Sequence, residues 1–138
     1  MSIIDEEILE NQSLEWFKEL NYQYKNGYEI SPEGKSPERD DFKQVILEKR
    51  LRSAMSRINP DIPTQKISNS ITQILNPNIP DLFNCNRQIH SWLTKGLKIT
   101  YMKDDQEIGC QLKLIDFDSV ANDDFLVVNQ YEVKGDKR

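Results

Sequence analysis

The chain has 138 residues, of which 37% are hydrophobic and 30% charged, a composition that suits one compact domain without a membrane-spanning segment. Its 18 basic and 23 acidic side chains give a net charge of -5, which argues against a protein whose whole surface binds nucleic acid or membrane. Two cysteines and one histidine cannot supply the four ligands of a structural zinc ion. The acidic N-terminal decapeptide is unlike a signal peptide, so we expect a cytoplasmic protein with reduced thiols.

The first two thirds of the chain are predicted to be mainly helical. Residues 5–20 form the first predicted helix, with Ser2 and Asp5 at the spacing of a capping box. At the angular spacing of a helix, one apolar arc of its surface is formed by Leu9, Trp16, Phe17 and Leu20. A loop over 26–36 follows. Further helices are predicted over 47–58, around the apolar pattern 67–75 between Pro63-Thr64 and Asn76-Pro77, and over 87–95.

The last third of the chain shows strand patterns. Residues 97–102 and 109–117 flank a polar turn and are predicted to form an antiparallel hairpin, and residues 125–133 a third strand with an exposed edge. Helices followed by strands indicate an α+β fold, with N-terminal helices and an antiparallel sheet of about three strands. We expect residues 1–138 to form a single domain.

Glu10 is the acidic residue in the most informative position. It falls at the edge of the apolar arc of the first helix, where a carboxylate either finds a partner or takes part in chemistry. Glu6, one turn earlier, is interpreted as a solvated acid favoured by the helix dipole. From the residues alone, a solvated and a functional role both stay open for Glu10.

A basic stretch over 42–58 stands out in this acidic chain. Its Lys49, Arg50 and Arg52 could contact the phosphates of DNA. An ordinary solvated helix face is an equally good interpretation, because Glu48 and Arg52 are spaced as an i,i+4 ion pair.

Other candidates are weaker. Asp116 and Asp118 could hold a divalent ion at a strand end, but acids there are usually turn residues. His90 is best interpreted as a partly buried helix residue. The chain contains no P-loop, dinucleotide-binding glycine motif, zinc-protease motif or serine-hydrolase motif.

Four segments of the sequence resemble one family. They are ENQSLEWFKELNY (10–22), SPERDDFKQVILEKRLRSAMSRINP (36–60), NRQIHSWLTKGLKI (86–99) and LIDFDSVANDDFLVVNQYEVKG (114–135). Together they resemble the N-terminal region of the restriction (R) subunit of type I restriction–modification enzymes, over about residues 6–138.

The resemblance implies a truncated nuclease domain of the restriction-endonuclease-like, or PD-(D/E)xK, type. In that family the strand ending VVNQYEVKG is followed by a segment that supplies a metal-binding Asp and a Glu-x-Lys pair, which we expect to be encoded downstream of Arg138. Glu10 fits the first acid of such a site, so the resemblance makes it the candidate catalytic residue, with no complete metal site in this chain. The full subunit would use Mg²⁺ and ATP, whereas the fragment should bind neither and should not cleave DNA.

The resemblance also implies partners, namely DNA and the methyltransferase (M) and specificity (S) subunits of the complex, with no membrane. Two alternatives to a nuclease fragment remain. One is a non-catalytic docking module that links the motor subunit to the M–S core. The other is a small independent protein that contains a domain of this family.

Overall fold

A computed structural model describes residues 5–135 of the chain. They divide into two compact units. Unit 1 comprises residues 5–47 together with 125–135, and unit 2 is the continuous segment Glu48–Asp124.

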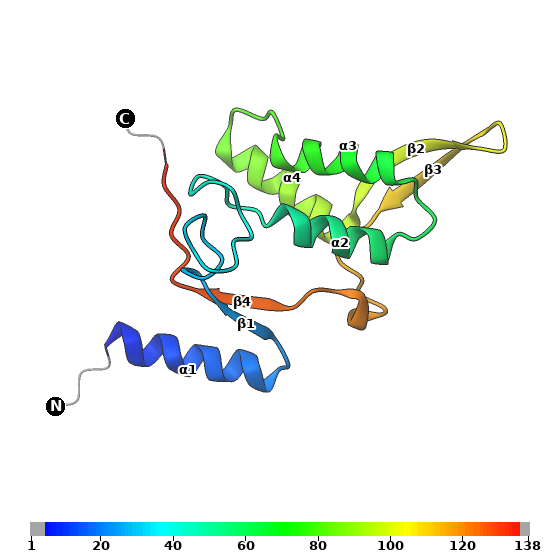
Figure 1. Ribbon diagram of the computed structural model, residues 1–138. Helices are drawn as coiled ribbons and strands as arrows, with labels where there is room; N and C mark the ends of the chain where they lie inside the picture. The colour runs from blue at the N-terminus through cyan, green and yellow to red at the C-terminus, as the bar shows by residue number, and fades with distance from the viewer. Residues whose placement is uncertain (1–4, 136–138) are drawn as a thin grey trace. The chain divides into compact units, whose positions relative to one another are not determined.

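Unit 1 is built from one helix and two short strands (Figure 1). Helix α1 spans Glu6–Glu19, and the side chain of Asp5 caps its first turn by accepting a hydrogen bond from the Ile8 amide at 2.9 Å. Ser2 lies outside the described residues. Strands β1 (Gln23–Asn26) and β4 (Leu126–Asn129) pair in parallel along their whole length, so segments from the N-terminal and C-terminal parts of the chain form one sheet.

Helix α1 rests on these strands through a narrow contact face. Leu14 is buried. The Phe17 ring packs edge-to-face against Tyr22, and the Tyr22 ring packs in the same way against Phe125. The predicted apolar arc is only partly used, because Leu9, Trp16 and Leu20 remain more than half exposed. A two-stranded sheet is too narrow to cover the whole apolar surface of a helix.

The segment between β1 and unit 2 has no regular structure but is firmly packed. Ile30 is fully buried within it. Arg39 is 2% exposed, and its guanidinium donates to the backbone carbonyls of Phe42, Gln44 and Glu132. Because Glu132 follows β4, this arginine fastens the irregular segment to the C-terminal part of unit 1.

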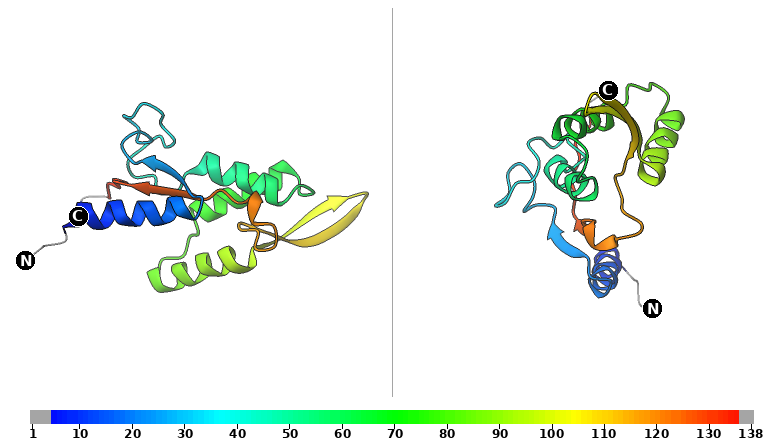
Figure 2. Two further views of the ribbon diagram at one scale, coloured as in Figure 1. Left: turned by 90° about the horizontal axis from the view of Figure 1, so that it is seen from below. Right: turned by 90° about the vertical axis from the view of Figure 1, so that its right-hand side faces the viewer.

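Unit 2 packs three helices with a hairpin. The helices are α2 (Glu48–Ile58), α3 (Thr64–Leu75) and α4 (Leu82–Lys95). The strands are β2 (Leu97–Lys103) and β3 (Gln106–Leu112), followed by the short 3-10 helix η1 (Val120–Asn122). Figure 2 shows the hairpin extending past the helices of this unit, and its turn at Asp104 and Asp105 has positive φ at both residues.

The core of unit 2 lies between its helices and the base of the hairpin. Met55, Ile71 and Leu112 are at most 1% exposed. Asn59, at the end of α2, links two parts of this core, because its amide donates to the Lys113 carbonyl and accepts from the Lys113 amide at 2.8 and 2.9 Å. The backbone groups of Lys113, directly after β3, are thereby hydrogen-bonded to a buried side chain.

The α+β class is confirmed, as are the four helices, although α4 begins at Leu82 rather than at about Arg87 as predicted. The antiparallel hairpin is also confirmed, although its second strand spans Gln106–Leu112 rather than 109–117. The strand predicted over 125–133 is shorter, at Leu126–Asn129. The predicted three-stranded antiparallel sheet is wrong, because β4 pairs in parallel with β1, a strand that the sequence patterns missed. None of the helices in residues 5–135 is long and apolar enough to cross a membrane.

Candidate functional site

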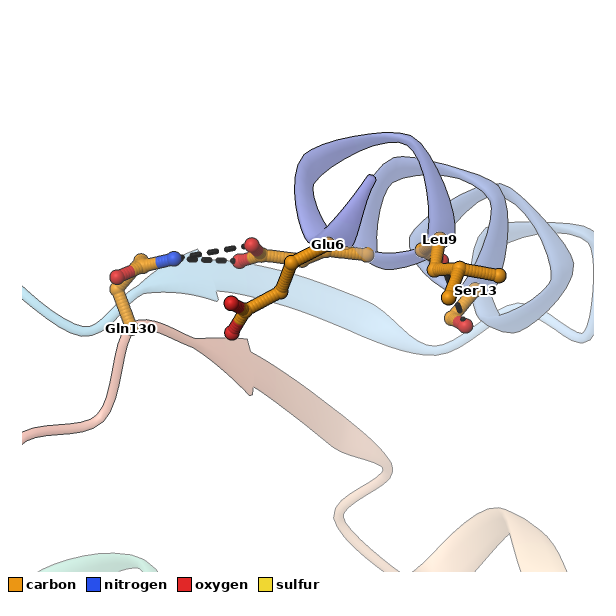
Figure 3. A pocket seen from close by; sticks show the side chains of 5 residues that line it. Glu6, Leu9, Ser13 and Gln130 are labelled. Carbon is orange, nitrogen blue, oxygen red and sulfur yellow. Dashed lines mark hydrogen bonds between the residues drawn. The ribbon is translucent and has the colours of Figure 1, made fainter. Parts of the chain in front are cut away.

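The Glu10 carboxylate is hydrogen-bonded to Gln130, a residue in the C-terminal part of the chain. It lies on the second turn of α1, half-buried, and faces Gln130, the residue directly after β4. The Gln130 side-chain amide donates to both carboxylate oxygens of Glu10, at 3.0 Å to Oε1 and 2.9 Å to Oε2 (Figure 3). Of the two alternatives for a carboxylate at this position, a partner or a role in chemistry, the structure shows a partner.

The parallel pairing of β1 and β4 explains how these residues come together. Gly27, directly after β1, donates its amide to the Asn129 carbonyl at 2.7 Å. Gln130 then turns away from the strand with a φ of 53°, in the left-handed region that a residue with a side chain seldom adopts. Its side chain thereby projects at the end of β4, where α1 presents Glu10.

A surface pocket of about 390 Å³ surrounds this contact. Its lining residues are Glu6, Leu9, Glu10, Ser13 and Gln130. Glu6 and Glu10 are one helical turn apart, so two carboxylates border the same pocket. A pocket with this charge favours a cation or hydrogen-bond donors over a phosphate group.

The pocket does not amount to a metal centre. Within residues 5–135, no group of three or more histidine, cysteine or acidic side chains could hold a metal ion. The Glu10 carboxylate already accepts two hydrogen bonds from Gln130. The described residues therefore do not fit a Mg²⁺ ion by themselves.

The tripeptide from Glu132 to Lys134, which begins two residues after Gln130, has the Glu-x-Lys spacing of nuclease sites. Both side chains are exposed, and the Lys134 ammonium lies 4.3 Å from the centre of the Phe42 ring. The Lys134 amide also donates to the Phe42 carbonyl. These contacts give Lys134 a structural role in holding the irregular segment of unit 1.

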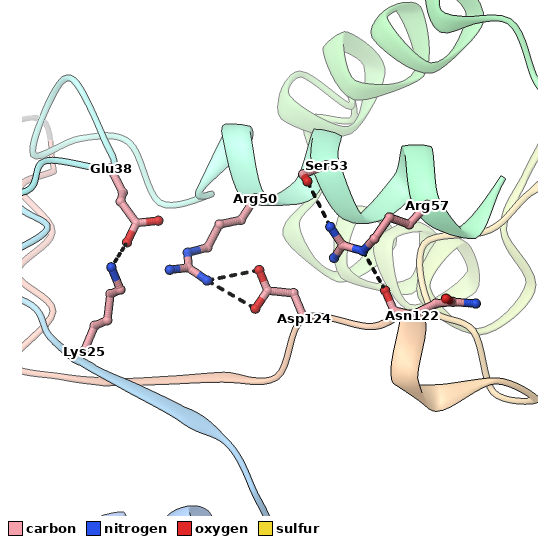
Figure 4. Close-up of polar contacts among 7 residues, drawn as sticks. All are labelled: Lys25, Glu38, Arg50, Ser53, Arg57, Asn122 and Asp124. Carbon is pink, nitrogen blue, oxygen red and sulfur yellow. Dashed lines mark hydrogen bonds and ion pairs between the residues drawn. The ribbon is translucent and has the colours of Figure 1, made fainter. Parts of the chain in front are cut away.

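The basic residues predicted to contact DNA all lie on α2, in unit 2. Arg50 pairs with the Asp124 carboxylate at 3.0 and 3.2 Å (Figure 4). Arg52 pairs with Glu48 at 3.1 Å, as its spacing predicted, and donates to the Ser68 hydroxyl. Lys49 is exposed. The two arginines thus have partners within their own unit, which favours the interpretation as an ordinary helix face.

Asp116 has the surroundings of a turn residue. Its carboxylate accepts from the Asp118 and Ser119 amides at 3.0 and 2.8 Å, and from the Asn122 side chain at 3.2 Å. The hydrogen bond from Ser119, followed by that from Asn122, holds the pKa of Asp116 below its ordinary value. This set of donors stabilises the loop before η1. His90 is exposed on α4 rather than partly buried.

Sequence reasoning missed Gln130 and Arg39. Gln130 lay within a quoted phrase, and the only signal was a polar Asn-Gln pair that ends an apolar strand. Arg39 gave no signal, because a buried arginine that binds carbonyls from distant residues cannot be told from a surface arginine in sequence.

Comparison with known proteins matches residues 3–138 to a family described as the N terminus of the type I restriction enzyme R protein. The chain is 33% identical, over 92% of its length, to the type I restriction enzyme MjaIXP endonuclease subunit of Methanocaldococcus jannaschii. It is 25% identical, over 99% of its length, to the type I restriction enzyme HindI endonuclease subunit of Haemophilus influenzae. It spans only 12% and 13% of these two relatives. No solved structure matches the chain.

Proposed function

The chain belongs to the family of type I restriction enzyme R protein N termini, and from this premise we propose that it forms the first part of a DNA-cleaving nuclease domain. The domain would be of the PD-(D/E)xK type and would belong to an ATP-dependent subunit that cleaves unmodified foreign DNA after translocation. M and S subunits would be its partners. Two relatives named as endonuclease subunits support this assignment.

The contact between Glu10 and Gln130 is the observation that carries the proposal. It joins an acid on the first helix to the end of β4, at the strand that precedes the remaining site residues in the family. In such a nuclease Glu10 would supply the first acid. The metal-binding Asp and the Glu-x-Lys pair would come from a segment that this sequence does not contain.

The chain alone should not cleave DNA. Nucleases of this type hold Mg²⁺ between several carboxylates, and that ion activates water and stabilises the charge that develops on the phosphate. The described residues offer Glu10 with Glu6 beside it, and no group of three ligands. ATP use would belong to motor domains in other parts of the subunit.

The alternative is a docking module that attaches the R subunit to the M–S core. Two observations favour it. The first is that Leu9 and Trp16 on α1, and Leu20 directly after it, are more than half exposed. The internal ion pairs of Arg50 and Arg52 also leave less positive charge for DNA than the sequence indicated.

The test uses a complete R subunit that carries this chain at its N terminus. If the region is part of a nuclease, Glu10→Ala should reduce DNA cleavage and leave ATP hydrolysis and co-purification with M and S subunits unchanged. Glu7→Ala, an exposed acid on the same helix, is the matched control. If the region only docks, Glu10→Ala should cleave like the wild type, a result that would remove Glu10 from the site.

A second variant tests the DNA contact. Lys49→Glu reverses an exposed charge on α2, whereas changing Arg50 or Arg52 would also break an internal ion pair. If Lys49 contacts phosphates, the variant should weaken DNA binding and reduce its dependence on salt concentration. Release of the subunit from its M and S partners would instead favour docking.

A further inference from the structure

Gln130 directly follows β4, and its side chain is hydrogen-bonded to Glu10 on α1 and to Tyr28 in the segment after β1. We infer that Gln130 is a positioning residue that fixes the orientation of the Glu10 carboxylate, while the Tyr28 hydroxyl fixes the orientation of the Gln130 amide. This inference rests on the proposed function of Glu10 and deepens it, because it names the group that would hold the first acid in place.

The chemistry of the two side chains dictates which way the amide points. An ionised carboxylate has only acceptors, so the nitrogen of Gln130 must face Glu10. That nitrogen lies 3.0 and 2.9 Å from the two carboxylate oxygens, which restricts rotation of the carboxylate about its bond to the side chain. The amide oxygen then faces the Tyr28 hydroxyl, at 3.3 Å. The three groups form one chain of donors and acceptors.

The backbone holds Gln130 where this contact can form. Its φ of 53° is a strained conformation for a residue with a side chain, and such residues tend to gather at functional sites. Gly27 approaches it so closely that a Cβ atom there would lie 2.1 Å from the Gln130 carbonyl oxygen. A side chain at position 27 would therefore clash with the turn after β4.

Arg39 and Tyr131 fix the other side of the same turn. Arg39 donates to the carbonyl of Glu132, two residues after Gln130, and its guanidinium carbon lies 4.1 Å from the centre of the Tyr131 ring. The Tyr131 hydroxyl donates to the Val45 carbonyl at 2.8 Å. Gln130 is thus anchored on both sides, as a residue that orients another group should be.

A plain structural tether between α1 and β4 would show the same hydrogen bonds, so the experiment has to separate the two roles. A tether contributes to stability, whereas a positioning residue changes the rate of the chemical step and does so only through Glu10. Gln130→Met suits this purpose because it keeps the length of the side chain and removes the donor. Gln12→Met, at an exposed position on α1, is the matched control.

The variants are made in the complete R subunit, assembled with its M and S subunits, and cleavage is measured as a single-turnover rate at saturating DNA. We expect Gln130→Met to lower this rate roughly tenfold, in line with the loss of a group that orients a ligand. ATP hydrolysis and the half-saturating DNA concentration should not change. In a Glu10→Ala background, Gln130→Met should cause no further loss. Tyr28→Phe should lower the rate two- to threefold, a small effect because its hydrogen bond is long and exposed.

A spectroscopic measurement tests the contact without any activity. In the ¹⁵N-labelled 138-residue chain, the side-chain amide resonances of Gln130 should move in Glu10→Ala and stay in place in Glu7→Ala. Resonances that do not respond to Glu10→Ala would overturn the inference.

The outcomes separate the inference from the proposed function. If Glu10→Ala is defective while Gln130→Met cleaves at the wild-type rate, the inference is overturned and the proposed function stands. The same holds if the two losses simply add in the double variant. If Glu10→Ala cleaves at the wild-type rate, both fall.

Discussion

Arg39 offers a test of how the irregular segment of unit 1 is held. The guanidinium donates to three carbonyls, two within its own segment and one at Glu132, and it lies over the Tyr131 ring. Arg39→Met keeps much of the side-chain volume and removes all of these interactions. Because the residue is 2% exposed, water cannot easily replace them.

The effect of Arg39→Met on the free energy of unfolding is the difference between favourable and unfavourable contributions of the arginine. Hydrogen bonds from a charged donor contribute about 1.5 to 3 kcal/mol each, and a desolvated cation over an aromatic ring contributes roughly 2 kcal/mol. Against this stands the cost of burying a guanidinium without a carboxylate, which amounts to several kcal/mol. The net loss for Arg39→Met should be about 3 kcal/mol in the free energy of unfolding.

Urea unfolding followed by circular dichroism measures this loss. Arg39→Lys should lie between the wild type and Arg39→Met, since one ammonium cannot reach all three carbonyls. Lys35→Met, at an exposed position of the same segment, is the control and should stay within about 0.5 kcal/mol of the wild type. A change of that small size in Arg39→Met would refute the reasoning.

Two further predictions concern unit 2. Asn59→Ala leaves both backbone groups of Lys113 without their partner and should cost about 2 to 4 kcal/mol in urea unfolding, whereas a loss below 1 kcal/mol would contradict the role of this buried amide. Asp116 has a lowered pKa in the folded state, so its contribution to stability is present above its ordinary value of 3.8 and is lost as the pH falls below it. The free energy of unfolding should therefore decline less steeply below that pH in Asp116→Asn than in the wild type, and equal slopes would refute this assignment.

The helices could be predicted because their signals are local. Apolar residues at helical spacing marked α3, and Gly96 marked the end of α4, where the structure has it with a φ of 81°. The hairpin was likewise visible, since its two strands are joined by a short polar turn. In each case the deciding residues lie within a few positions of one another.

The sheet of unit 1 could not be predicted for the opposite reason. β1 has four residues, three of them polar or charged in character, and its partner β4 lies a hundred positions further along the chain. Parallel pairing between such distant segments leaves no local pattern. The same distance explains why Glu10 was identified as a candidate while its partner Gln130 was not.

The most direct test of the central claim is the rate at which the complete R subunit linearises supercoiled plasmid DNA when Glu10 is replaced by glutamine. Glu10→Gln keeps the size of the side chain and removes its charge, and Glu7→Gln makes the same change at an exposed position on α1. If Glu10 is a direct ligand in a nuclease site, its loss should cost several kcal/mol of transition-state stabilisation, which is a decrease of roughly a hundredfold or more. Glu7→Gln should cleave like the wild type, and ATP hydrolysis should be unchanged in both. Equal rates of linearisation by the wild type and Glu10→Gln would contradict the account.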